Sequence, residues 1–241
     1  MLWRPLAAWW GDTSGNHALL RGQRTRAQAF FEWALKLEPT WALLHEDLGR
    51  ALLQTDPRGA LREFDLAACG AACTAEAGDA LVRMGCLDEG IDRYITAKAV
   101  SRVSDIALSL SQRGEYNRAT ALVEALIAKL RDKFLERADL ASAYATLGRI
   151  KLDAARANPA QAREIRRTAI AAYESASRLA PFNEGYLLSY AFAQMQWGDA
   201  DAAQRAFERV LELHPHQSDA EAALARIARN DGLKATPSGS P

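Results

Sequence analysis

One spacing recurs six times along this chain of 241 residues and constrains its fold more than any other feature. In the first copy, Gly15 is followed twelve residues later by Ala27, and Phe31 lies four residues further on. The later copies separate their two small residues by 11, 12, 12, 21 and 12 positions: Gly49 and Ala60, Gly78 and Gly90, Ala107 and Ala119, Gly148 and Ala169, and Ala191 and Ala203. Four positions after the second small residue, these copies hold Phe64, Tyr94, Val123, Tyr173 and Phe207. Five of the six gaps agree within one residue, which indicates a repeated structural unit.

The spacing inside each copy is that of an α-helical hairpin. A small residue and a ring four positions apart lie on one face of an α-helix. Small residues on both helices allow a close antiparallel approach, and the ring fills the remaining space. Turn and helix-end signals fall between the expected helices: Gly22, Gly85, Gly114 and Gly198, the pairs Asp56-Pro57 and Asn158-Pro159, and Pro39, Pro181 and Pro215.

The pattern resembles the tetratricopeptide repeat family, whose unit is a helix hairpin of about 34 residues. The resemblance covers residues 8–217 and implies an all-α fold, an α-solenoid of about six helix hairpins. The units are expected near residues 8–41, 42–70, 71–99, 100–133, 134–183 and 184–217. The second and third units are short and lack a closing proline.

The end of the chain departs from the regular repeat. The fifth unit carries nine extra residues between its small positions, which predicts helices about one turn longer each. That long hairpin is either a docking feature or a tolerated insertion. Ser218 followed by Glu221 predicts a capping box that starts a capping helix over residues 218–231. Residues 232–241 are predicted to be a disordered tail.

The resemblance also implies a binding surface for a protein or peptide partner. Stacked hairpins form a concave groove lined by their first helices. The residue after each first small position and the residue one turn further on are expected to face that groove: Asn16, Leu19, Arg50, Leu53, Asp79, Val82, Leu108, Ser111, Arg149, Leu152, Phe192 and Met195. For each apolar member, packing against the neighbouring helix is the alternative.

The two ends of this groove differ in character. The amino-terminal half is polar, whereas Phe192 and Met195, with Tyr186 and Tyr190 nearby, are expected to anchor an apolar partner segment. Some members of the family grip the terminal carboxylate of a chaperone with inward basic residues. Asp12 and Asp79 stand in the corresponding region and would repel a carboxylate, which argues against that role.

No pattern in the sequence predicts catalysis, and we expect no enzyme activity, cofactor or metal. The four histidines are scattered, at His17, His45, His214 and His216. Thirty basic residues balance thirty acidic ones, and no broad basic patch with interleaved aromatics predicts nucleic-acid binding. Cys69 and Cys73 either form a disulfide or fill a helix corner as small apolar residues, depending on the redox compartment.

Five of the six tryptophans lie within the first 41 residues: Trp3, Trp9, Trp10, Trp33 and Trp41. Tryptophan is typical of the interface between membrane and water. The rings therefore indicate a membrane-proximal placement, or they cap the first helix pair. No apolar run in the chain is long enough to predict a transmembrane segment. The compartment stays open between the cytoplasm and a bacterial periplasm, with tethering to a membrane in a longer protein as a further alternative.

The predicted function is a protein–protein interaction scaffold, such as an assembly factor or subunit of a membrane-associated complex. The alternatives are a soluble regulatory adaptor that captures a single peptide and a non-catalytic accessory subunit of an enzyme.

Overall fold

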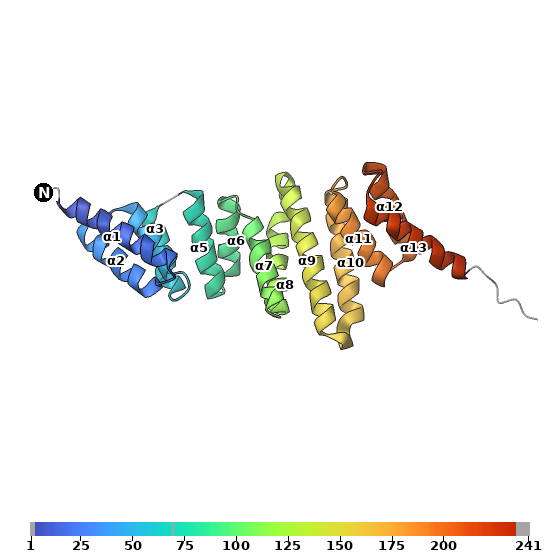
Figure 1. Ribbon diagram of the computed structural model, residues 1–241, viewed down its shortest axis with the longest axis horizontal. Helices are drawn as coiled ribbons and strands as arrows, with labels where there is room; N and C mark the ends of the chain where they lie inside the picture. Colours follow the sequence, from blue (N-terminus) through green and yellow to red (C-terminus); the bar gives the residue numbers. More distant parts are fainter. Residues whose placement is uncertain (1–2, 69, 235–241) are drawn as a thin grey trace, which may run out of the picture. The chain divides into compact units, whose positions relative to one another are not determined.

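The computed structural model describes residues 3–68 and 70–234, and within them the fold is all-α (Figure 1). The helices are α1 (Trp3–Leu20), α2 (Arg24–Leu37), α3 (Ala42–Leu52), α4 (Pro57–Ala67), α5 (Ala71–Met84), α6 (Leu87–Thr96), α7 (Ser101–Gln112), α8 (Tyr116–Leu130), α9 (Arg137–Ala157), α10 (Ala162–Leu179), α11 (Glu184–Trp197), α12 (Ala200–Leu213) and α13 (Ser218–Lys234). Each expected repeat range holds two α-helices, so the predicted all-α helix-hairpin solenoid is confirmed. Cys69 lies outside the described residues, and so does 235–241 of the predicted tail.

The chain divides into two compact units between Val103 and Ser104, in the first turn of α7. In the first unit, α1 packs on α2, α3 on α4 and α5 on α6, and successive hairpins are joined by α2 against α3 and α4 against α5. In the second unit, α8 packs on α9, α10 packs on both α9 and α11, and α12 packs on α11 and α13. Within each unit, these helices therefore pack on their neighbours in the sequence, as a repeat array requires.

In four hairpins a ring of the second helix is seated on a glycine of the first helix. A β-carbon added to Gly49 would come within 2.6 Å of the ring of Phe64, and one added to Gly148 within 2.9 Å of Tyr173. Phe64 is buried, and it belongs to a continuous core cluster that also contains Leu44 and Leu48. The absence of a β-carbon on the first helix is what admits the ring from the second helix.

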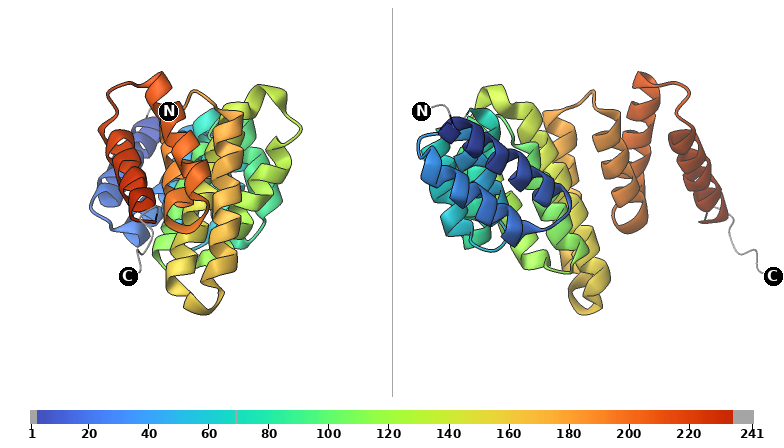
Figure 2. Two further views of the ribbon diagram at one scale, coloured as in Figure 1. Left: turned by 90° about the vertical axis from the view of Figure 1, so that its right-hand side faces the viewer. Right: turned by 60° about the vertical axis from the view of Figure 1, so that its left-hand side comes forward.

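The fifth hairpin is longer than its neighbours, as predicted. α9 has 21 residues and α10 has 18, against 14 each in α11 and α12. The turn between α9 and α10 extends past the ends of the adjacent helices (Figures 1 and 2).

Three sequence predictions about helix ends have different outcomes. Asp56 caps α4 as predicted, because its Oδ1 accepts from the backbone N–H of Gly59 at 2.9 Å. The predicted cap by Asn158 is wrong, since its side chain donates to Gln161 Oε1 at 3.3 Å and makes no cap bond. At α13 the capping side chain is Gln217, whose Oε1 accepts from Ala220 N at 2.7 Å; Ser218 is already the first helical residue.

The boundary of the predicted tail is also corrected. α13 continues to Lys234, three residues beyond the predicted end of the capping helix. The helix packs on α12 through Ala220, Ala223 and Ile227, which are buried in one core cluster with Phe207.

Candidate partner-binding surface

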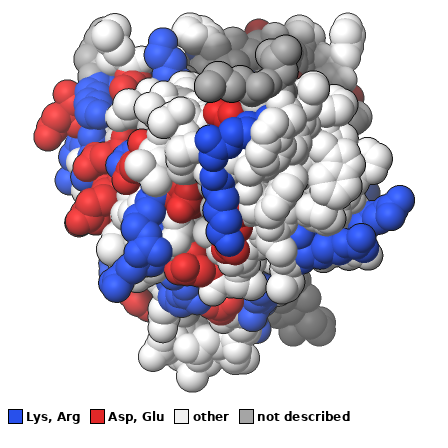
Figure 3. Space-filling model, turned by 90° about the vertical axis from the view of Figure 1, so that its left-hand side faces the viewer, with Lys and Arg blue, Asp and Glu red and all other residues white. Residues whose placement is uncertain are grey.

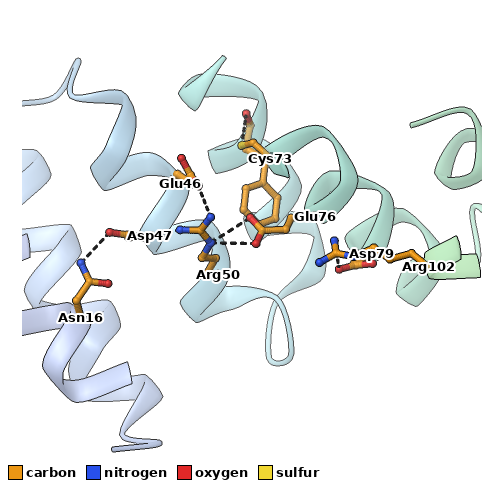
Figure 4. Close-up of polar contacts among 9 residues, drawn as sticks. Asn16, Glu46, Asp47, Arg50, Cys73, Glu76, Asp79 and Arg102 are labelled. Atoms are coloured by element: carbon orange, nitrogen blue, oxygen red, sulfur yellow. Dashed lines mark hydrogen bonds and ion pairs between the residues drawn. The ribbon is translucent and has the colours of Figure 1, made fainter. Parts of the chain in front are cut away.

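In the first unit, a chain of polar contacts links the first helices of successive hairpins (Figure 4). Asn16 on α1 donates through Nδ2 to Asp47 Oδ2 on α3 at 2.9 Å and to Asp12 Oδ1 on its own helix at 3.2 Å. Asn16 was predicted to face a partner. The structure instead uses its amide to join two carboxylates, one from each helix.

Arg50 continues this chain of contacts from α3 to α5. Its Nε donates to both carboxylate oxygens of Glu76, at 3.0 and 3.2 Å, and one terminal nitrogen donates to Asp47 Oδ1 at 3.0 Å. The other terminal nitrogen pairs with Glu46. Since three carboxylates surround one guanidinium, Arg50 is a structural link rather than a free clamp for an acidic partner.

Asp79 on α5 accepts two further bonds, from the Tyr94 hydroxyl at 2.6 Å and from Arg102 at 3.0 Å. Burial, followed by the hydrogen bond to the charged Asp79, raises the pKa of Tyr94 above its ordinary value. The hydroxyl therefore stays protonated and keeps its donor role.

The carboxyl groups outnumber the cations along this row. Asp12 is 8% exposed, and burial first, then the hydrogen bond and charge of Asp47, raises the pKa of Asp12 to about 6. The row holds two cations and five carboxyl groups. Arg50 pairs with three of the carboxylates, Arg102 pairs with Asp79, and Asp12 is the fifth. This row of contacts therefore carries an excess of carboxyl groups over cations.

The apolar positions predicted for this part of the groove are largely packing residues. Leu19 and Leu53 are half-buried against the core cluster of the first unit. Val82 is buried, and its Cγ2 would lie 2.8 Å from a β-carbon on Gly90. The prediction that Val82 faces a partner is therefore wrong, because the close approach of α5 and α6 takes up its side chain.

In the second unit, three consecutive first helices line one open depression of about 310 Å³. Leu108 comes from α7, Arg149 from α9, and Tyr186 with Ser189 from α11. α7 and α9 are also joined directly, since Thr146 Oγ1 donates to Ser104 Oγ at 3.2 Å. The sequence predicted Leu108 and Arg149 as groove residues, and the fold brings them together.

Tyr173, from the second helix α10, completes the wall of this depression. It is buried, and burial raises the pKa of its hydroxyl to about 12. A neutral phenol, a guanidinium, a second tyrosine and a leucine therefore meet in one place. Such a mixture suits a polypeptide segment with both polar and apolar groups.

The remaining predicted residues of the second unit lie elsewhere. Ser111 is buried, and among the described residues its Oγ has no hydrogen-bond partner, so its predicted place in the groove is wrong. Leu152 is half-buried. Phe192 and Met195 are half-buried against the core cluster around Phe207, with the rings of Phe192 and Phe207 5.0 Å apart and edge to face.

Two other features, metal-ligand clusters and membrane-spanning helices, concern the part of the chain that the structure describes. It contains no cluster of three or more His, Cys, Asp or Glu side chains placed to hold a metal ion. None of its helices combines the length and the apolar character needed to cross a bilayer.

Two observations decide the architecture. Successive first helices are joined through their side chains, and in four hairpins a ring of the second helix is seated on a glycine of the first. The architecture is an all-α solenoid of stacked helix hairpins. That assignment rests on the hairpins of this chain itself.

Comparisons with known proteins find solved structures that are distant in sequence. No protein-family model matches the chain, and no curated protein matches it. Similar solved structures include the APC/C hetero-tetramer Cut9-Hcn1, with 12% identity over 92% of this chain and a TM-score of 0.46. They also include MamA from Desulfovibrio magneticus RS-1 (21% identity, 88% of this chain and 97% of that chain, TM-score 0.37) and PilF of Pseudomonas aeruginosa (17% identity, 94% and 99%, TM-score 0.41). This chain spans 43% of the matched chain in the Cut9-Hcn1 structure.

Proposed function

We propose that this protein is an interaction scaffold that holds a segment of a partner protein against its first helices, as an assembly factor or subunit of a membrane-associated complex. The observation that carries the proposal is the depression of the second unit, where Leu108, Arg149 and Tyr186 from three consecutive first helices converge. Convergent residues from successive repeats are the usual way in which a helical solenoid binds an extended segment.

The two units favour different features in the partner. The acidic row around Arg50 in the first unit favours Lys and Arg side chains, and it contributes mainly to association rate and specificity. The depression of the second unit favours a side chain that packs between Leu108 and Tyr186 while a carboxylate or carbonyl accepts from Arg149.

Site-specific photocrosslinking tests this proposal. A photoreactive phenylalanine analogue replaces Leu108 in one variant and the exposed Ala128 on the second helix α8 in a control. We expect Leu108 to give a discrete crosslinked protein in native cells, identified by mass spectrometry, and Ala128 to give none. Equal crosslinking at both positions, or crosslinking at Ala128 alone, would place the binding surface away from the first helices.

Ionic strength gives a second test on the captured partner. Binding that involves the acidic row weakens as salt rises, because exposed charges are screened over about 10 Å at 0.1 M salt. A partner whose affinity is independent of salt would contradict the part assigned to the first unit.

A further inference from the structure

The outer face of the first hairpin carries exposed aromatic side chains that the core of the first unit does not cover. The exposed fractions are 63% for Trp3, 67% for Leu6, 58% for Trp9 and 55% for Trp10 on α1, and 40% for Trp33 on α2. These five residues, with the half-buried Phe30 of α2, are called the aromatic face below. Trp3, Leu6 and Trp10 are spaced three and four residues apart, which places them on one side of α1.

The rings are held in place and still reach solvent. Trp10 meets Phe30 and Trp33 edge to face, with ring centroids 5.7 and 6.0 Å apart. The guanidinium carbon of Arg26 lies 5.7 Å from the centroid of Phe30. Open depressions of about 430 and 350 Å³ lie along α1 and α2 beside these rings. The rings therefore do more than cap the first helix pair, since a cap would bury them.

The charges around the aromatic face are almost all positive. Between Trp3 and Leu37 the cations are Arg4, Arg21, Arg24, Arg26 and Lys36, and the acidic residues are the buried Asp12 and the exposed Glu32. Arg4 lies near the start of α1 and Arg21 follows its end, so cations flank the rings on both sides. No carboxylate lines either depression. Figure 3 looks at this end of the first unit and shows a broad uncharged area with Lys and Arg side chains beside it.

We infer that the aromatic face docks on the surface of an anionic lipid bilayer, with α1 lying in the interfacial layer. Indole rings favour the boundary between headgroups and acyl chains, where the ring is sheltered and its N–H stays hydrated. Each nearby Lys or Arg adds attraction to anionic headgroups, on the order of 1 kcal/mol per residue. A rim in which five cations outnumber the one exposed carboxylate, that of Glu32, is complementary to a negative surface.

The docking rests on the membrane-associated part of the proposed function and is independent of the partner groove. Its failure would leave crosslinking at Leu108 unaffected, and a failure of that crosslinking would leave the bilayer contact untouched. The two proposals can therefore be separated experimentally.

Vesicle co-sedimentation of the full chain tests the inference. The probes are phosphatidylcholine vesicles with and without phosphatidylglycerol. We expect binding to the anionic vesicles, with a blue shift of tryptophan fluorescence, and at least about tenfold weaker binding to the neutral ones. Trp3→Ala with Trp9→Ala is expected to lower binding to anionic vesicles at least about tenfold, and Arg4→Glu with Arg21→Glu to abolish the preference for anionic lipid.

A matched control removes exposed apolar side chains elsewhere. Leu66→Ala with Phe182→Ala removes residues that are 62% and 74% exposed and should leave vesicle binding unchanged. Circular dichroism confirms that each variant is folded. No binding of the wild-type chain to anionic vesicles would overturn the inference, and so would equal loss in the control. Self-association of the wild-type chain that Trp3→Ala with Trp9→Ala abolishes, without vesicle binding, would reassign the aromatic face to a protein contact.

Discussion

Gly15 on α1 lies directly against the ring of Phe31 on α2, so that a β-carbon on Gly15 would come within 2.4 Å of Phe31 Cε1. Phe31 is fully buried. The same relationship joins Gly49 to Phe64, Gly78 to Tyr94 and Gly148 to Tyr173. Glycine is unfavourable in a helix interior by about 1 kcal/mol relative to alanine, so its repeated use at this position reflects the space that the ring needs.

Gly15→Ala is therefore expected to destabilise the first unit. Overpacking against a ring costs about 1 to 3 kcal/mol of folding free energy. The gain in helix propensity from Gly to Ala is about 1 kcal/mol, so the net change is a loss for most of that range. The midpoint of urea unfolding, followed by far-ultraviolet circular dichroism, measures the change.

Two comparisons isolate the cause of that loss. Phe31→Leu in the Gly15→Ala background should recover part of the lost stability, because the smaller side chain makes room for the new methyl group. Gly185→Ala in α11 meets only Asn183 Oδ1 at 3.4 Å and should be neutral or slightly stabilising. Equal destabilisation by Gly15→Ala and Gly185→Ala would show that the ring contact is not the reason.

Asp12→Asn should stabilise the protein at neutral pH. The pKa of Asp12 is raised from 3.8 to about 6 in the folded chain, chiefly by burial. The contribution of the protonated Asp12 carboxyl to the free energy of unfolding is fully present below about pH 4, and it is lost as the pH rises through about 6. The amide cannot ionise and can still donate to Asp47, so we expect a gain on the order of 1 to 2 kcal/mol at about pH 7.5 and almost none at about pH 4.

Unfolding midpoints measured across this pH range check the sign for Asp12. The control is Asp88→Asn, since Asp88 is exposed in the first turn of α6 and should leave the slope between about pH 4 and 7 unchanged. A parallel pH profile for wild type and Asp12→Asn would contradict the raised pKa.

Arg50→Met should destabilise the first unit through the carboxylates that it leaves behind. Glu46, Asp47 and Glu76 would then face one another without a cation. We expect a loss of about 1 to 2 kcal/mol, below the value for a fully buried pair because 36% of the Arg50 side chain is exposed. Arg93→Met is the matched control: its ion pair with Asp65 is exposed and should contribute at most about 1 kcal/mol. Similar losses in the two variants would mean that Arg50 is an ordinary surface cation.

Gln217→Ala should loosen the start of α13, because it removes the acceptor of the Ala220 N–H at 2.7 Å. Loss of a side-chain cap costs about 1 kcal/mol. Hydrogen exchange of the amides at 219–221 should accelerate about fivefold in this variant, which corresponds to that free energy. Ser218→Ala should change the exchange rates of these amides little. Faster exchange in Ser218→Ala than in Gln217→Ala would show that Ser218 is the cap.

Residue spacing was enough to predict every hairpin, because helical periodicity and turn residues act locally. Asp56 as a cap and the longer α9 and α10 also followed from local sequence. Helix ends were less certain. The acceptor at the start of α13 is Gln217, one residue before Ser218, and helix boundaries commonly differ by one or two residues from those expected.

The candidate surface was only partly predictable for the same reason. Leu108 and Arg149 were predicted from their register and line the depression of the second unit, whereas Tyr173 and Ser189 also line it and come from positions that this register does not mark. Val82 and Ser111 share the register of true surface residues and are nevertheless buried. Register indicates the side of a helix that a residue occupies, and the distance to the next helix decides whether that side is open.

The sequence by itself determined the repeated hairpin, since the alternation of small residues and rings is specified by contacts within a few helical turns. Only the tertiary structure decided the partners of Arg50 and Asp79, the division between Val103 and Ser104, and the exposure of the aromatic face. The physical reason is range. Propensity, capping and periodicity act between residues a few positions apart, whereas ion pairs such as Arg50 with Glu76 join residues 26 positions apart and exist only after hairpins stack.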